Sequence, residues 1–95
     1  MMAANAGPPT VARCFGENLR RCRKRADLSQ EEVGLLSSLH RTEISLLERG
    51  TRIPRINTLI KLAAALGVPA ATLLAGIEWG PGQVEAGKFD IEGRK

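Results

Sequence analysis

The chain has 95 residues, which is enough for one domain with a single core. A protein this small buries only about 60 to 65 per cent of the surface that its unfolded chain exposes. A formal net charge of +4, few aromatic residues and abundant Leu, Ala, Arg and Glu favour helix over sheet. No run approaches about 18 apolar residues, and the N-terminus lacks a charged segment followed by an apolar one. We therefore expect neither a membrane span nor an export signal, and predict a cytoplasmic protein.

The first predicted helix follows an arm over residues 1–10, which contains Pro8 and Pro9 and is expected to be disordered. It begins at Val11 or Arg13, ends at Arg25 and buries Phe15, Leu19 and Cys22. Cys14 and Cys22 are eight residues apart, about 12 Å along such a helix, so they cannot form a disulfide with each other. With His40 as the only histidine and no C-x-x-C spacing, we expect free thiols, no metal and no cofactor.

The second and third predicted helices span about residues 29–36 and 40–48. Ser29 and Glu32 have the spacing of a capping box, which starts the second helix with Leu28 beside it as an apolar staple. Gly34 allows another helix to approach its backbone closely. The helical pattern breaks at Ser37 and Ser38 and resumes at His40, and Gly50 is expected to terminate the third helix in a left-handed conformation.

The third helix has two faces with different chemistry. Ile44, Leu47 and the aliphatic stem of Glu48 point toward the core. The opposite row consists mainly of polar and basic side chains, namely Arg41, Thr42, Ser45, Leu46 and Arg49. A helix held in this way can lie in the major groove of DNA, which is about 12 Å wide and admits one helix.

A fourth helix from about Arg55 to Leu66 and a short fifth helix complete the predicted all-α fold. The fourth helix places Ile56, Leu59, Ile60, Leu62 and Ala63 in the core and stops at Gly67. Pro69 fits the first turn of the fifth, which carries Leu73 and Leu74 to about Ala75. We expect residues 11–78 to form the domain. In the Gly-rich tail over 79–95, Phe89-Asp90-Ile91 could form a short strand, and we favour partial order over disorder because Trp79 follows the last helix directly.

The basic residues fall into two groups along the chain. Residues 13–25 hold five arginines and one lysine against Glu17 alone, and residues 49–61 hold Arg49, Arg52, Arg55 and Lys61. Residues 27–48 between them contain five acidic side chains and Arg41 as the single basic one apart from His40. Two basic groups on either side of a nearly neutral helix suit contacts with the two sugar-phosphate strands of a duplex. The alternative is a solvated basic face without a ligand.

Three motifs carry a resemblance to a known family. They are Leu28-Ser29-Gln30-Glu31-Glu32, Ile44-Ser45-x-Leu47-Glu48-Arg49-Gly50 and Leu59-x-x-Leu62-Ala63-x-Ala65-Leu66-Gly67-Val68. At this spacing the chain resembles the Cro and phage-repressor type of helix-turn-helix protein, also called XRE-like, over residues 16–75. The resemblance implies that the helix from about residue 40 is the recognition helix, that Gln30 touches a phosphate or supports that helix, and that Arg23 pairs with Glu48.

The expected DNA contacts follow from these positions. Arg41 is suited to a bidentate contact with guanine O6 and N7. Thr42 could contact a thymine methyl group or a phosphate. The full base-contacting set is Arg41, Thr42, Ser45 and Leu46, and the backbone-contacting set is Arg20, Gln30, His40, Arg49, Arg52 and Arg55. Glu43 has an open role, since it could accept from cytosine N4, hold Arg41 or simply be solvated.

Some residues depart from the family pattern. Leu46 replaces a polar or basic side chain, so it offers an apolar contact to thymine methyl groups or no base contact. His40 stands where Ser or Thr is usual, and its neutral ring is a poorer helix cap. Leu35 and Leu36 occupy positions that are commonly polar, so that an apolar side chain near Leu39 would face water and could form a partner surface.

The sequence therefore predicts a sequence-specific DNA-binding transcriptional regulator, a repressor that occupies its operator as a homodimer. The candidate dimer surface is Leu73, Leu74, Ile77 and Trp79, although Leu73 and Leu74 could instead only close the core. The alternative function is a protein-interaction module, such as an antitoxin or adaptor, that uses the same bundle to bind a protein partner. An enzyme is not expected, because the chain has a lone histidine, no evident pair of catalytic carboxylates and no Gly-rich phosphate loop.

Overall fold

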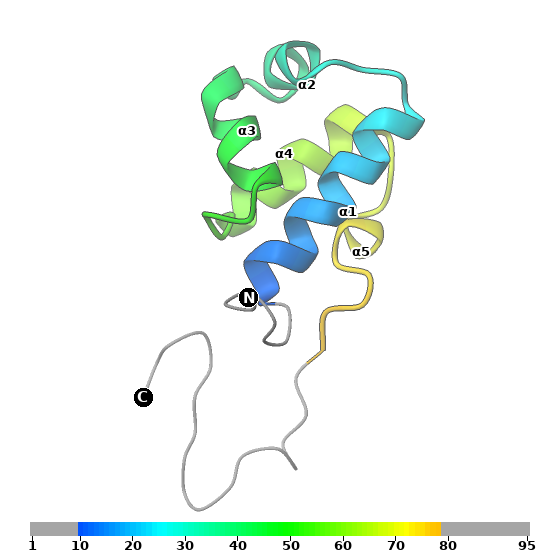
Figure 1. The fold of residues 1–95 in the computed structure, drawn as a ribbon. Helices are drawn as coiled ribbons and strands as arrows, with labels where there is room; N and C mark the ends of the chain where they lie inside the picture. Colours follow the sequence, from blue (N-terminus) through cyan, green and yellow to red (C-terminus); the bar gives the residue numbers. More distant parts are fainter. Residues whose placement is uncertain (1–9, 79–95) are drawn as a thin grey trace, which may run out of the picture.

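The computed structural model describes residues 10–78, which form five α-helices in one bundle (Figure 1). The helices are α1 (Val11–Arg25), α2 (Gln30–Ser37), α3 (Arg41–Glu48), α4 (Ile56–Leu66) and α5 (Ala70–Leu73). The all-α prediction is confirmed. Residues 1–9 of the predicted arm, Trp79 and the predicted strand at 89–91 lie outside the described residues, while Thr10, the last residue of the predicted arm, is the N-cap of α1. No helix in the described range is long and apolar enough to cross a lipid bilayer.

Apolar side chains from all five helices meet in one core. Helix α1 supplies Phe15, Leu19 and Cys22, as the spacing predicts, and Cys14 and Cys22 are both free thiols. The other buried apolar residues are Val33 of α2, Ile44 and Leu47 of α3, Leu59, Leu62, Ala63 and Leu66 of α4, and Leu73 of α5. Figure 1 shows α3 on the left with α1 to its right, α2 at the top of the bundle and α5 at the lower right.

The predicted core stripe of α4 is partly wrong. Ile56 is 72% exposed and Ile60 is 58% exposed. The buried residues are Leu59, Leu62, Ala63 and Leu66, which follow the three-and-four spacing of one helix face. At about 100° per residue, Ile56 and Ile60 leave the helix about 60° and 100° to the same side of Leu59. They therefore form an apolar flank beside the buried stripe.

Helix α5 is a single turn and is shorter than predicted. Pro69 is the N-cap rather than a residue of the first turn, and the helix ends at Leu73. Leu73 is completely buried and closes the core, while Leu74 is 40% exposed. The prediction that Leu73 belongs to a dimer surface is wrong for this reason, because a side chain inside the core cannot contact a second subunit.

A buried asparagine of α1 holds the segment around α5 in place. The Asn18 Nδ2 amide donates to the carbonyl oxygens of Leu73 and Ala75, both at 2.9 Å, and its Oδ1 accepts from Arg21. These carbonyl groups lie at the C-terminal end of α5, where no intrahelical donor remains for them. Asn18 therefore supplies the donors that a one-turn helix lacks. In the sequence, the burial of Asn18 is indicated by its position between the core residues Phe15 and Leu19.

Two glycines allow the helices to approach closely. A Cβ on Gly34 would lie 2.7 Å from the carbonyl oxygen of Leu39, which confirms the close approach predicted between α2 and the segment entering α3. A Cβ on Gly16 would press against the Leu47 carbonyl oxygen and lie 2.8 Å from that of Glu48. Helix α1 thus passes directly behind the C-terminal end of α3, a contact that the sequence did not indicate.

Candidate nucleic-acid interface

A tight turn and a histidine cap set the start of α3. Ser38 adopts a left-handed conformation with φ of 61°, and the Leu39 amide donates to the Gly34 carbonyl oxygen at 2.8 Å. The chain then enters α3 at His40, whose Nδ1 accepts a hydrogen bond from the Thr42 amide at 3.0 Å. The imidazole therefore satisfies one of the free amides of the first turn, as Ser or Thr would. A neutral ring that accepts at Nδ1 carries its proton on Nε2.

The inner side of α3 is anchored to two other helices. Ile44 and Leu47 are completely buried. The Glu48 carboxylate accepts from Arg23 Nε at 2.6 Å and Nη2 at 3.0 Å, and from Gln30 Nε2 at 3.0 Å. The ion pair that the resemblance implies between Arg23 and Glu48 is thus present, and Gln30 supports α3 through the same carboxylate. Because Arg23 comes from α1 and Gln30 from α2, one carboxylate joins three helices.

The pair of Arg23 and Glu48 is shielded from water, with side-chain exposures of 12% and 3%. Arg23 Nη1 also donates to the Leu28 carbonyl oxygen at 2.9 Å. Hydrogen bonding to Glu48 raises the pKa of Arg23 above its already high ordinary value, against the opposing effect of burial. When folding raises the pKa of a basic group, the stabilisation is fully present below the pKa of the unfolded state. It is lost as the pH rises through the higher pKa of the folded state. Arg23 therefore stays charged at every pH near neutrality.

The outer side of α3 carries the predicted base-contacting residues. Arg41, Thr42 and Arg49 are exposed, and Ser45 and Leu46 are half-buried. The predicted backbone-contacting residues come from elements on either side of this helix. Arg20 is exposed on α1, Gln30 is half-buried at the start of α2, and His40, Arg52 and Arg55 are exposed at the two ends of the segment around α3. These exposed basic groups thus lie on elements that come before and after α3 in the chain.

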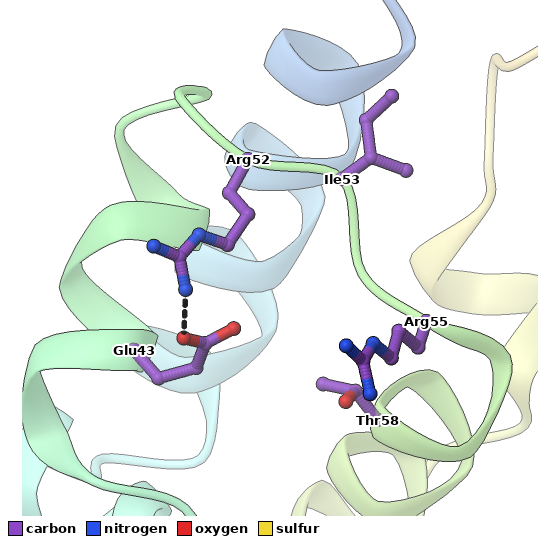
Figure 2. Close-up of a pocket in the computed structure, with 5 residues that line it drawn as sticks. All are labelled: Glu43, Arg52, Ile53, Arg55 and Thr58. Carbon is purple, nitrogen blue, oxygen red and sulfur yellow. Dashed lines mark hydrogen bonds and ion pairs between the residues drawn. The ribbon is translucent and has the colours of Figure 1, made fainter.

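A hollow lies beside α3 where the loop after it leads into α4 (Figure 2). Its volume is about 480 Å³, and its lining residues are Glu43, Arg52, Ile53, Arg55 and Thr58. Arg52 Nη1 lies 2.5 Å from Glu43 Oε1, so the predicted phosphate ligand Arg52 is bound to an acidic residue of α3. The sequence leaves the role of Glu43 open and gives no indication of its pairing with Arg52.

Residues 19–73 match the Helix-turn-helix family. The chain belongs to this family. It is 41% identical over 61 residues to the control protein C.BamHI of Bacillus amyloliquefaciens, which covers 63% of this chain and 75% of that protein. It is 36% identical over 64 residues to the cryptic phage CTXphi transcriptional repressor RstR of Vibrio cholerae, which covers 67% of this chain and 58% of that protein.

Solved structures of family members share this fold. The restriction-modification controller protein C.AhdI from Aeromonas hydrophila superposes with a TM-score of 0.64 and 37% sequence identity, over 65% of this chain and 94% of that chain. The matched family region begins within α1 and ends at the last residue of α5. The family assignment therefore covers α2, α3 and the contacts that anchor α3, which are the parts that form the candidate interface.

Proposed function

We propose that this protein is a sequence-specific DNA-binding transcriptional regulator, a repressor that acts by occupying its operator. The observation that carries this proposal is the division of α3 between a buried, ion-paired inner side and an outer side on which Arg41 and Thr42 are exposed. Such a helix has a fixed orientation and can enter a major groove without rearranging the core. The names of the relatives, a transcriptional repressor and two control proteins, support the same function.

Base recognition is assigned to the first turns of α3. Arg41 would donate both ends of its guanidinium to guanine O6 and N7, a contact worth about 1–3 kcal/mol of discrimination. Thr42 and Leu46 would contact thymine methyl groups, and Ser45 would hydrogen-bond to a base edge. Because Leu46 is half-buried, its side chain is suited to a close apolar contact with a base and not to a contact at longer range.

The phosphate contacts are assigned to the groups around α3. Arg20, Arg49 and Arg55 are exposed, and their positive charges would contact phosphate groups of the two DNA strands. His40 would donate from Nε2, since its Nδ1 is occupied as the helix cap. Gln30 donates to Glu48, so its main role here is to position α3, and any phosphate contact would use its remaining amide hydrogen.

The protein is proposed to act as a homodimer, because one helix covers few base pairs and two half-sites lie about 34 Å apart on one face of the duplex. Of the predicted dimer residues, Leu74 is exposed and Ile77 is half-buried, so both remain available. Trp79 comes two residues after Ile77 in the sequence and stays part of the prediction. This role involves no catalysis and no cofactor.

A protein-interaction module is the second candidate, favoured by one observation. Leu35 and Leu36 on α2 are 76% and 59% exposed, although Leu39 beside them is half-buried against the core. Adjacent exposed leucines on a short helix are suited to a protein partner. One molecule has room for both a DNA-contacting face on α3 and a protein-contacting surface at Leu35 and Leu36.

The proposal is tested by selecting bound duplexes from a random pool and comparing two substitutions. We expect Arg41→Ala to weaken binding to the selected duplex about 5- to 150-fold and to relax the preference at one G·C pair. Arg20→Ala should weaken selected and scrambled duplexes equally and reduce the salt slope by about 1. A selected consensus with two-fold symmetry is expected for a dimer. Equal loss on both duplexes for Arg41→Ala would contradict base recognition by α3.

A further inference from the structure

Glu43 stands out among the charges around α3. Between His40 and Lys61 the chain holds four arginines and one lysine but two acidic residues, Glu43 and Glu48. Glu48 is buried behind α3 with Arg23, so it presents little charge to a ligand on the outer side. Glu43 is therefore the one carboxylate of this segment that is placed near an approaching duplex.

The position of Glu43 on the helix argues against base contact. Glu43 precedes the buried Leu47 by four residues, so both side chains leave α3 on the same side. The Glu43 carboxylate consequently points toward the loop and α4 and lines the hollow, where its Oε1 meets Arg52 Nη1 at 2.5 Å (Figure 2). Arg41, Thr42 and Arg49 lie on other sides of the helix and are exposed. Cytosine N4, one of the alternatives that the sequence leaves open for Glu43, is thus disfavoured.

The same hollow has the chemistry of a phosphate site. The guanidinium groups of Arg52 and Arg55 and the hydroxyl group of Thr58 line it together. Helix α4 starts at this point with no side-chain hydrogen bond capping it and no acidic residue in its first turn, as far as the described residues show. The free amides and the positive end of the helix dipole add to the attraction for an anion there. Glu43 is the one acidic group in the lining.

We propose that Glu43 is an internal counter-anion that occupies Arg52 in the free protein and must give it up to a phosphodiester group of DNA. The carboxylate takes the place of the phosphate, and the pair opens or is shared when the duplex binds. Affinity is lowered at every sequence, because both the lost ion pair and the repulsion between carboxylate and phosphate act on the backbone and carry no base information. Glu43 thus sets how tightly the protein holds DNA in general, whereas Arg41 sets which bases it prefers. This inference rests on the proposed DNA-binding function.

The test is Glu43→Gln, which keeps the shape of the side chain and removes its charge. Binding is measured with a mixed-sequence duplex and with a duplex selected from a random pool, over a range of salt concentrations. We expect about 3- to 10-fold tighter binding to both duplexes and a salt slope steeper by about 1, since Arg52 becomes a full phosphate contact. Glu31→Gln on α2 is the matched control, because it removes the same charge from an exposed residue outside the hollow. The control should show a smaller gain.

Arg52→Gln tests the pair from its other side. In the wild-type background it should weaken binding to both duplexes, and combined with Glu43→Gln it should remove most of the gain. Unchanged or weaker binding of Glu43→Gln to the mixed-sequence duplex would overturn the inference, as would a loss of preference at a C·G pair, which would make Glu43 a base contact. Failure of the wild-type protein to bind either duplex would overturn the proposed function itself. The thermal melts of all variants confirm that each one folds.

Discussion

Glu48→Ala is expected to lower the free energy of unfolding by about 3–5 kcal/mol. The substitution removes the acceptor of three hydrogen bonds from Arg23 and Gln30. Arg23 then remains as a charge with a side chain only 12% exposed and no carboxylate beside it. Leaving one member of a buried pair uncompensated is more costly than removing both, because the remaining Arg23 charge has lost most of its water and keeps only the hydrogen bond to the Leu28 carbonyl oxygen.

Chemical denaturation of the wild type and three variants measures this effect. Arg23→Met combined with Glu48→Met should lose less stability than Glu48→Ala alone, since no buried charge is left unpaired. Glu31→Ala, on the exposed side of α2, should change stability by no more than about 0.5 kcal/mol. A loss below about 1 kcal/mol for Glu48→Ala would show that this network does not anchor α3.

Gly16→Ala is expected to lower stability by about 2–3 kcal/mol. The added Cβ would meet the carbonyl oxygens of Leu47 and Glu48, which are backbone atoms of α3 and cannot move aside by rotating a side chain. Helix α1 must therefore separate from α3. On the proposed function, DNA affinity should fall as well, because the same contact fixes the C-terminal end of α3.

The direction of this effect distinguishes packing from helix propensity. Alanine favours a helix over glycine by about 1 kcal/mol, so propensity alone predicts that Gly16→Ala is stabilising. Glu17→Ala at the adjacent exposed position of α1 is the control and should change stability by no more than about 0.5 kcal/mol. A denaturation midpoint at or above that of the wild type for Gly16→Ala would contradict the close approach.

Local signals in the sequence predicted most helix ends. The capping box at Ser29 and Glu32 is present, and Gly50 and Gly67 adopt φ values of 75° and 69° where α3 and α4 stop. These features depend on residues within one turn of each other, and their geometry follows from the residue types. The burial of Ile56 and Ile60 was predicted wrongly because periodicity gives the direction of a stripe only to within about one residue. Which side of the buried stripe of α4 is also covered depends on where the neighbouring helices pack.

The candidate site was predictable in its outline but not in its pairings. The outer row of α3 follows from the positions of Ile44 and Leu47, both completely buried. Glu43 is nine residues from its partner Arg52, and the two carbonyl oxygens that accept from Asn18 are more than fifty residues from it. A helical pattern carries no information on such contacts. Glu48 is the exception, because its pairing with Arg23 was implied by the family resemblance.

The most direct test of the account is an NMR titration of the isotope-labelled protein with a duplex selected from a random pool. We expect the largest changes in amide chemical shift on the outward side of α3 and its C-cap, with smaller changes at the start of α4. The residues concerned on and beside α3 are Arg41, Thr42, Ser45, Leu46 and Arg49. Changes concentrated at Leu35 and Leu36, with the amides of α3 unaffected, would contradict the claim that the outward face of α3 contacts DNA.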